Sequence, residues 1–167
     1  RGGLYRINKA LEISCRGNQS QWITMMSFPG ETATIDAKTF TEVLPSGKPP
    51  SQFRLGAVQI ENASYLRFEH ITVTNSTCAG IMIKGTGTSH IKIYHCQVDR
   101  TYSSGIGVWY ANSVEVKHCE ITRANDKSMK APKQPERRET PHEALTLAGA
   151  VNFDIAYNHI HLCYKEG

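Results

Sequence analysis

The 167-residue sequence has no apolar run long enough to span a membrane and no recognisable signal peptide at its start. Its five cysteines are an odd number and do not make a disulfide framework, and no Cys/His spacing is typical of a zinc site. Lysine and arginine are scattered among acidic residues, without a recognisable nucleic-acid-binding motif. These absences argue against a membrane-spanning, disulfide-rich or nucleic-acid-binding protein, while the formal charge of +4 permits an acidic partner.

A pattern of five apolar positions repeats four times along the chain. Apolar and polar residues alternate within each copy, as in Leu66-Arg67-Phe68, which is the two-residue period of a strand with one buried face. Helical spacing fits none of these segments. The four copies are Val58, Ile60, Leu66, Phe68 and Val73; Ile81, Ile83, Ile91, Ile93 and Val98; Ile106, Val108, Val114, Val116 and Ile121; and Leu145, Leu147, Phe153, Ile155 and Ile160.

The spacing of the copies predicts a solenoid. Successive copies lie roughly 23 to 25 residues apart, and the last is delayed by an insertion of about 15 residues. In such a fold no unit can bury its apolar face alone, so each unit stacks on its neighbour.

Register distinguishes a solenoid from an antiparallel sandwich, which alternation alone would also suit. Two neighbouring columns repeat related residue types: His70, His95, His118 and Tyr157 form one, and Ile71, Cys96, Cys119 and Asn158 form the other. We therefore predict an all-β fold, a right-handed parallel β-helix with three short strands and about 4.8 Å of rise per coil. We expect Cys96 and Cys119 to be packed free thiols, and the histidines to form a structural or solvent-facing ladder instead of a metal site.

We interpret residues 1–167 as a single domain. Residues 1–53 hold N-terminal coils and a proline-bearing loop, residues 54–167 form the regular coils, and residues 127–141 are a charged insertion without an apolar period. The chain starts without methionine, and Gly167 has the register at which a further coil would begin. We therefore expect the sequence to be a fragment of a longer protein.

Several short segments carry a family resemblance. They are Trp22-Ile23-Thr24 with Ser27-Phe28-Pro29-Gly30-Glu31 and Ile35-Asp36, then Ala79-Gly80-Ile81-Met82-Ile83, Ser104-Gly105-Ile106-Gly107-Val108 and Tyr157-Asn158-His159-Ile160. They resemble bacterial right-handed β-helix proteins of the pectate-lyase-like superfamily, over nearly the whole chain. That superfamily contains polysaccharide lyases, glycoside hydrolases, epimerases and non-catalytic binding proteins, so function must be argued from the site. The resemblance implies a secreted or periplasmic carbohydrate-active protein.

The outward residues of the first strand in each coil are candidates for binding a sugar. They form two columns: Gln59, Met82, Gly107 and Thr146, then Glu61, Lys84, Trp109 and Ala148. We expect Trp109, which lies beside Gly107, to be exposed, so that its ring would suit the apolar side of a pyranose. The alternative is that the insertion covers Trp109. We include Lys84 among the substrate-binding candidates.

The turn before that strand changes character along the solenoid. One column holds Cys78, Ser103, His142 and Lys165; the next holds Ala79, Ser104, Glu143 and Glu166. Arg100 and Arg123 share a column at the start of the turn, with Tyr102 close behind. Stacked like charges are tolerated more readily when a metal, a counter-charge or an anionic ligand offsets them. The alternative is a solvated charged turn whose arginines pair with acidic residues.

These residue types suit β-elimination on a uronate-containing polysaccharide. That reaction needs a cation at the substrate carboxylate, a base and an acid. We assign Arg100 to substrate binding, Lys165 or Arg123 as the base and Tyr102 or His142 as the acid. Glu143 and Glu166 could bind Ca²⁺, although two carboxylates are fewer than a full shell requires.

Two other functions fit the same fold. In a glycoside hydrolase Glu143 and Glu166 would form the carboxylate pair, with Asp99 and Asp154 as weaker candidates. A non-catalytic glycan-binding, adhesin or tailspike-like module needs no such pair. The sequence thus predicts a polysaccharide or oligosaccharide partner, with a lyase ahead of a hydrolase and a binding module as the competing class.

Overall fold

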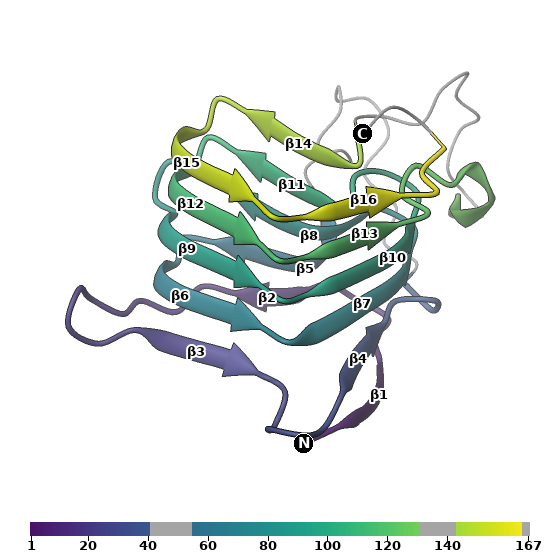
Figure 1. Cartoon of the computed structure of the whole chain (residues 1–167), viewed down its shortest axis with the longest axis horizontal. Helices are drawn as coiled ribbons and strands as arrows, with labels where there is room; N and C mark the ends of the chain where they lie inside the picture. Colours follow the sequence, from purple (N-terminus) through teal and green to yellow (C-terminus); the bar gives the residue numbers. More distant parts are fainter. Residues whose placement is uncertain (41–54, 131–142, 165–167) are drawn as a thin grey trace.

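The computed structural model describes residues 1–40, 55–130 and 143–164, and these fold into three parallel sheets stacked coil on coil (Figure 1). Along the chain, each coil places one strand in sheet B, one in sheet C and one in sheet A. The N-terminal strands lie at the bottom in Figure 1, and β14, β15 and β16 lie at the top. This arrangement confirms the predicted parallel β-helix.

Sheet A contains β1 (Gly3–Arg6), β4 (Ala33–Asp36), β7 (Ile71–Ser76), β10 (Gln97–Thr101), β13 (Glu120–Thr122) and β16 (His159–His161). Sheet B contains β2 (Leu11–Ile13), β5 (Gly56–Glu61), β8 (Ala79–Lys84), β11 (Ile106–Trp109) and β14 (Leu145–Ala148). Sheet C contains β3 (Ile23–Met26), β6 (Ser64–Glu69), β9 (Ser89–Tyr94), β12 (Asn112–Lys117) and β15 (Val151–Ala156). A short 3₁₀ helix, η2 (Lys127–Met129), follows β13.

The strand register confirms all five predicted apolar columns. Val58 pairs with Ile81, and Phe68 pairs with Ile93. In the last described coil, Phe153 pairs with Val114. The pairing also reveals an earlier coil of the same kind, whose inward residues are Leu11, Ile13, Ile23, Met25 and Ile35. The repeat therefore begins before the first of the four copies that the sequence shows clearly.

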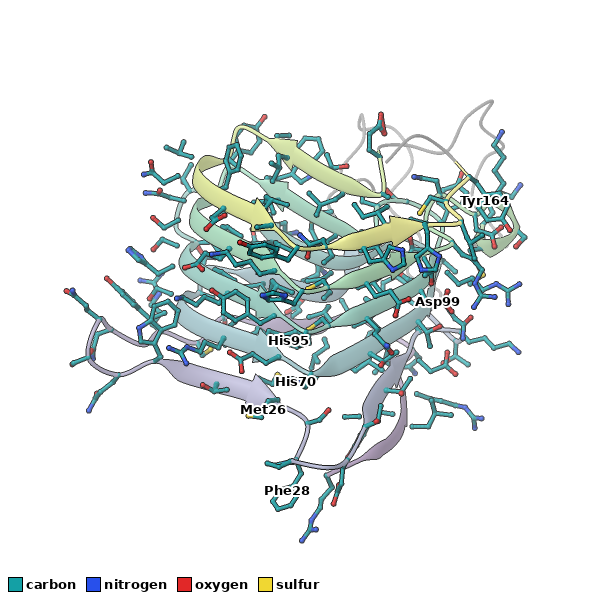
Figure 2. The ribbon with its side chains drawn as sticks, in the orientation of Figure 1. Met26, Phe28, His70, His95, Asp99 and Tyr164 are labelled. Atoms are coloured by element: carbon teal, nitrogen blue, oxygen red, sulfur yellow. The ribbon has the colours of Figure 1, made fainter. Side chains whose placement is uncertain are left out.

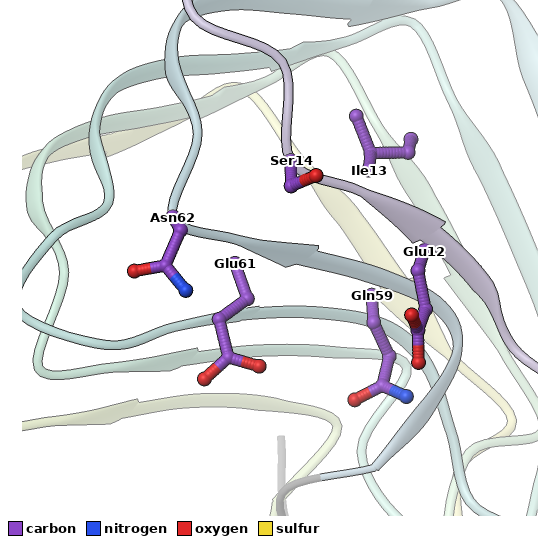
Figure 3. A pocket seen from close by; sticks show the side chains of 6 residues that line it. All are labelled: Glu12, Ile13, Ser14, Gln59, Glu61 and Asn62. Atoms are coloured by element: carbon purple, nitrogen blue, oxygen red, sulfur yellow. The ribbon is translucent and has the colours of Figure 1, made fainter.

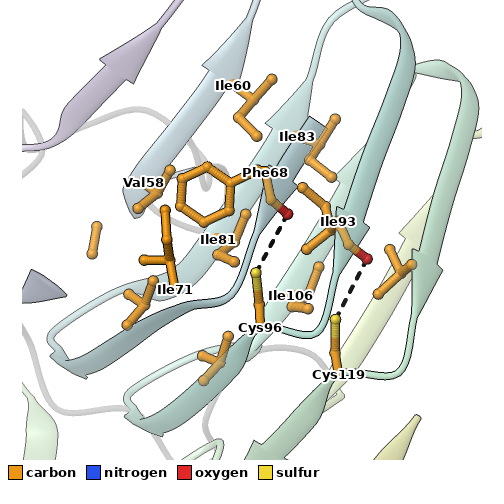
Figure 4. Close-up of a cluster of buried hydrophobic side chains, with 14 of the residues drawn as sticks. Val58, Ile60, Phe68, Ile71, Ile81, Ile83, Ile93, Cys96, Ile106 and Cys119 are labelled. Atoms are coloured by element: carbon orange, nitrogen blue, oxygen red, sulfur yellow. Dashed lines mark hydrogen bonds between the residues drawn. The ribbon is translucent and has the colours of Figure 1, made fainter. Parts of the chain in front are cut away.

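The core is the space enclosed by the three sheets. Phe68, Ile81 and Ile93 have no exposed surface. Cys96 and Cys119 are buried free thiols, and each lies within 3.5 Å of the backbone oxygen of an inward residue, Phe68 or Ile93 (Figure 4). The predicted packed thiols are confirmed.

The coil turns at the same four places each time, with the backbone in the left-handed region. The four columns, all with positive φ, are Asn62, Gly85, Tyr110 and Gly149; Tyr65, His90, Ser113 and Asn152; His70, His95, His118 and Tyr157; and Asn75, Arg100, Arg123 and Leu162. Gly, Asn and His tolerate this region better than most residues, which explains part of their recurrence.

The histidine column is a ladder of stacked rings. His70 stacks on His95 at 4.8 Å between ring centroids, His95 on His118 at 4.9 Å, and His118 on Tyr157 at 5.0 Å. Figure 2 labels His70 and His95 at the corner between sheets C and A, on the outside of the coil. The coil rise alone accounts for this spacing, and the three histidines are exposed, so the predicted solvent-facing ladder is confirmed.

Glycine recurs at the start of the sheet B strands for a steric reason. A Cβ at Gly80 would lie 2.3 Å from Cγ1 of Val98, and a Cβ at Gly105 would lie 2.4 Å from Cγ2 of Ile121. Each glycine therefore admits an inward side chain from the sheet A strand of its own coil, which explains the repeated Gly-Ile pair. Among the residues that the structure describes, no helix has the length and apolar character needed to cross a membrane.

Candidate functional site

The outward face of sheet B offers little open surface. Gln59 and Met82 point away from the core but are 6% and 0% exposed. A small pocket of about 160 Å³ lies at its N-terminal end, between β2 and β5, where Glu12 and Gln59 pair across the strands (Figure 3). Glu61 in this pocket forms an ion pair with Lys84, 3.3 Å away. Lys84, a predicted substrate-binding residue, therefore already has a carboxylate partner.

The outward face of sheet C carries a network of paired charges. Nζ of Lys92 and Nζ of Lys117 each lie 3.1 Å from a carboxylate oxygen of Glu115, and Lys117 also pairs with Asp154 at 2.5 Å. The Tyr94 hydroxyl donates a further hydrogen bond to Glu115. A cavity of about 380 Å³ over this face is lined in part by Trp22 and this network.

The network on sheet C shifts the pKa values of its members. Partial burial would raise the pKa of Glu115, but hydrogen bonds from Tyr94, Lys92 and Lys117 outweigh it and lower the pKa to about 2. Burial and the hydrogen bond to Glu115 raise the pKa of Tyr94 to about 12. Glu115 is therefore ionised, and its carboxylate oxygens already accept hydrogen bonds from Tyr94, Lys92 and Lys117. This makes Glu115 a poor catalytic acid.

The outward face of sheet A forms a polar groove, which we call the sheet A groove. Its cavity of about 290 Å³ is lined by Thr72, Thr74, Gln97, Val98, Asp99, Glu120, Thr122 and Arg123. These residues come from β7, β10 and β13, except Arg123, which directly follows β13. The strand register places Thr72, Gln97 and Glu120 in one row and Thr74, Asp99 and Thr122 in the next. Because side chains on a strand alternate, both rows point away from the core.

Asp99 anchors one side of the sheet A groove. It accepts hydrogen bonds from the Thr122 hydroxyl and from Nε of Arg123, both at 2.7 Å, and pairs with Nη2 of Arg123 as well. Burial opposes the ionised form, but these contacts lower the pKa of Asp99, and the same ion pair raises the pKa of Arg123. Asp99 is thus an ionised acceptor, and Arg123 a permanent cation.

A chain of hydrogen bonds crosses the groove through the other row. The Thr72 hydroxyl donates to Oε1 of Gln97 at 3.2 Å, and Nε2 of Gln97 donates to Oε2 of Glu120 at 3.2 Å. Oε1 of Glu120 lies 3.0 Å from Nε2 of His161. Polar groups of four successive coils are therefore connected, and the last link runs diagonally to His161, which pairs with Thr122.

Of the predicted site residues, Arg123 lies in the sheet A groove, and Arg100 shares its column. Nε of Arg100 lies 3.6 Å from the buried carboxylate of Asp126, which also caps η2. Both arginines therefore have an acidic partner, as the alternative interpretation of the turn expects.

Tyr102 is buried, at 4% exposure, and Trp109 is half-buried with its indole nitrogen enclosed.

Of the two predicted calcium ligands only Glu143 lies within the described residues, because Glu166 lies outside them, as do the catalytic candidates Lys165 and His142. Glu143 occupies the turn directly before β14, in the register of Ser104. Its Oε2 is buried and has no hydrogen-bond partner among the described residues. Ca²⁺ takes six to eight oxygen ligands, so the carboxylate of Glu143 does not by itself make a calcium site.

Sequence reasoning misses most of the residues that line the sheet A groove. It ranks Asp99 only as a weaker carboxylate, and it does not single out Gln97, Glu120 or the threonines. The available signal is the alternation in the third strand of each coil, where two polar residues flank one inward apolar residue, as in Gln97-Val98-Asp99 and Glu120-Ile121-Thr122. These outward positions repeat in place but not in residue type.

Comparison with known proteins bears on the fold. A family model described as a right-handed beta helix region matches residues 29–167. No curated protein and no solved structure gave a significant match. The matched residues include every described coil from β4 to β16, and the three parallel sheets are those that such a coil produces. The chain therefore belongs to the right-handed β-helix family.

Proposed function

We propose that this β-helix binds an oligosaccharide or polysaccharide along the outer face of sheet A. The observation that carries the proposal is the sheet A groove, in which hydroxyl, amide and carboxylate groups of successive coils stand in register. Such groups recognise the hydroxyls of a sugar by paired hydrogen bonds. A solenoid presents them at a fixed rise, so a linear polymer can bind along several coils. This role fits a secreted or periplasmic protein.

The contacts within the groove favour binding over catalysis. Asp99 is held ionised by Arg123 and Thr122, and Glu120 is held by Gln97 and His161. These side chains are fixed before any ligand arrives, so a ligand does not have to order them. Asp99, ionised and paired, is a hydrogen-bond acceptor and not a proton donor.

A polysaccharide lyase is the second candidate, and the arginine column favours it. Asp99 uses Nε and Nη2 of Arg123, and Asp126 uses Nε of Arg100, so each guanidinium keeps further N–H donors for a uronate carboxylate. The raised pKa of Arg123 suits it to this binding role better than to the role of base. The base would then be Lys165, with the acid supplied by His142.

The test pairs two isosteric variants on a glycan panel. The protein is titrated calorimetrically with neutral oligosaccharides and with polyuronates, while ultraviolet absorbance and reducing ends are followed together. Asp99→Asn in the sheet A groove is expected to weaken glycan binding at least about tenfold, or about 1.4 kcal/mol. Asp154→Asn on sheet C removes a comparable ion-paired carboxylate and is expected to leave binding unchanged.

Each outcome decides between the candidates. Binding without new absorbance or new reducing ends supports a binding module, whereas absorbance together with new ends establishes elimination. New ends alone indicate a glycoside hydrolase. Absence of binding across the panel, or equal losses for Asp99→Asn and Asp154→Asn, would refute the assignment to sheet A.

A further inference from the structure

Two histidines of the last described coil and a glutamate of the coil before it converge at the end of the sheet A groove. The ligating atoms of Glu120, His159 and His161 all lie within 4.8 Å of one another. The rings of His159 and His161 stack at 4.2 Å with 15° between their planes, and Nε2 of His161 lies 3.0 Å from Oε1 of Glu120. Within the described ranges this is the one group of at least three such side chains that meets this geometry.

The fold explains why these three side chains meet. His159 and His161 are two residues apart on β16, so both project from the same face of the strand. Glu120 on β13 pairs with His159 across the sheet and projects from that same face. The backbone therefore fixes all three Cβ positions, and only the side-chain torsions have to adjust for a shared ligand.

A second layer of contacts orients the carboxylate. Gln97 donates to Oε2 of Glu120 at 3.2 Å, and the Thr72 hydroxyl in turn holds the amide of Gln97 at 3.2 Å. Oε1 of Glu120 is thereby directed toward the histidines. Outer hydrogen bonds of this kind are the usual support of metal-ligating carboxylates, and their loss typically costs about 10- to 100-fold in metal affinity.

The donor set matches a zinc-like ion better than calcium. Two imidazoles and one carboxylate are N and O ligands that Zn²⁺ binds at about 2.0–2.2 Å, which sets tetrahedral ligand atoms about 3.3–3.5 Å apart. The three side chains need only a small contraction from their present spacing. The side chains of Glu120 and His161 are 41% and 34% exposed, so a fourth position is open to water or to a ligand.

We propose that Glu120, His159 and His161 form a binding site for Zn²⁺ or a similar divalent transition-metal ion, with one coordination position open beside the sheet A groove. The ion replaces the hydrogen bond between Nε2 of His161 and Oε1 of Glu120, and a proton on Nε2 moves to Nδ1 or to solvent. Glu120 also lines the sheet A groove, but the metal site needs neither Asp99 nor Arg123, so Asp99→Asn tests glycan binding without removing a metal ligand.

The experiment uses tag-free protein that has been stripped with a chelator and titrated with ZnCl₂ in a calorimeter, without glycan. One Zn²⁺ per chain is expected. Replacing both histidines (His159→Ala with His161→Ala) is expected to weaken binding at least about 100-fold, and Gln97→Ala about tenfold. The matched control is His70→Ala, which removes a histidine at the end of the ring ladder and should leave binding unchanged.

A second measurement keeps the proposal testable if the double variant fails to fold. In proton NMR spectra of the wild-type protein, Zn²⁺ is expected to shift the ring signals of two of the seven histidines, and Asp99→Asn should not alter this. Absence of Zn²⁺ binding, wild-type affinity in the double variant, or shifts confined to the other histidines would each overturn the proposal. Loss of glycan binding in Asp99→Asn with Zn²⁺ binding intact separates the two proposals.

Discussion

The two sides of the same strands follow different rules. Toward the core, Val98 of β10 continues a column of Val73, Ile121 and Ile160, all apolar and branched. On the outer side, Gln97 of β10 stands between Thr72 and Glu120, with His159 beyond. Packing constrains the inward position equally in every coil, whereas the outer position is free to change. Function in this solenoid is therefore to be sought where the columns vary.

The largest expected effect on stability comes from a substitution on the inward face of the strands. Phe68→Ala removes a fully buried ring from the core and is expected to lower the free energy of unfolding by about 3–5 kcal/mol. The matched control is its exposed neighbour, Arg67→Ala, which should change stability by no more than about 0.5 kcal/mol. Urea denaturation followed by circular dichroism measures both. Equal losses would contradict the distinction between the two sides.

An intermediate effect on stability is expected from a substitution at the corner between sheets C and A. Oδ1 of Asn158 accepts from the backbone N–H of Cys119 at 2.9 Å, and its Nδ2 donates to the carbonyl of Val116 at 2.8 Å. Asn158→Ala leaves both backbone groups without these partners and should cost about 1–3 kcal/mol.

The control for this corner is Asn112→Ala. Asn112 is exposed, does not have a positive φ, and accepts a side-chain hydrogen bond from Nδ2 of Asn152. Its replacement should leave stability nearly unchanged. Hydrogen exchange gives a local readout, because the Cys119 amide should exchange faster in Asn158→Ala only. Unchanged protection of that amide would show that another group replaces the side chain.

The difference between the two sides also explains how much the sequence could predict. The inward columns, from Val58 to Ile160, can be predicted from the sequence because the same packing constraint acts on these positions in every coil. The first coil is harder to recognise, since a long stretch of sequence without the apolar pattern separates Leu11, Ile13 and Ile23 from the regular copies. The stacked position of the histidine rings follows from register alone.

The candidate site is less predictable for physical reasons. Contacts between outward side chains depend on rotamers and on partners a coil away, as in the pairing of Arg123 with Asp99. The left-handed backbone at Arg100 and Leu162 is set by the shape of the coil, not by residue type. The cluster of Glu120 with His159 and His161 combines residues about 40 positions apart, so its signal exists only once the strand register is known.

A smaller and pH-dependent effect is expected on the outer face of sheet C. The pKa of Glu115 is lowered in the folded protein from 4.5 to about 2, so its ionised form stabilises the fold above the unfolded pKa. This stabilisation is lost as the pH falls from about 4.5 toward 2. Because solvent screens the network, Glu115→Gln should cost no more than about 1 kcal/mol at pH 7.

The pH profile tests that prediction directly. Urea denaturation of wild type and Glu115→Gln at a series of pH values should give curves that converge as the pH approaches 2. Tyr94→Phe removes one hydrogen-bond donor to Glu115 and should move the acid limb of the curve toward higher pH. A constant difference at all pH values would mean that the ionisation of Glu115 does not contribute.

The smallest effect on stability is expected in the sheet A groove, where the effect on binding should be the largest. A double-mutant cycle of Asp99→Asn and Arg123→Gln should give a coupling energy of about 0.2–1 kcal/mol, since the side chains are 25% and 45% exposed. Because the pKa of Asp99 is lowered in the folded protein, the coupling energy is fully present at pH values above the unfolded pKa of Asp99. It is lost as the pH falls through the lower folded pKa. Glycan affinity measured on the same variants should fall at least about tenfold. A loss of binding that far exceeds the loss of stability would mean that the pair is kept for its ligand and not for the fold, whereas matching losses would make the pair part of the scaffold.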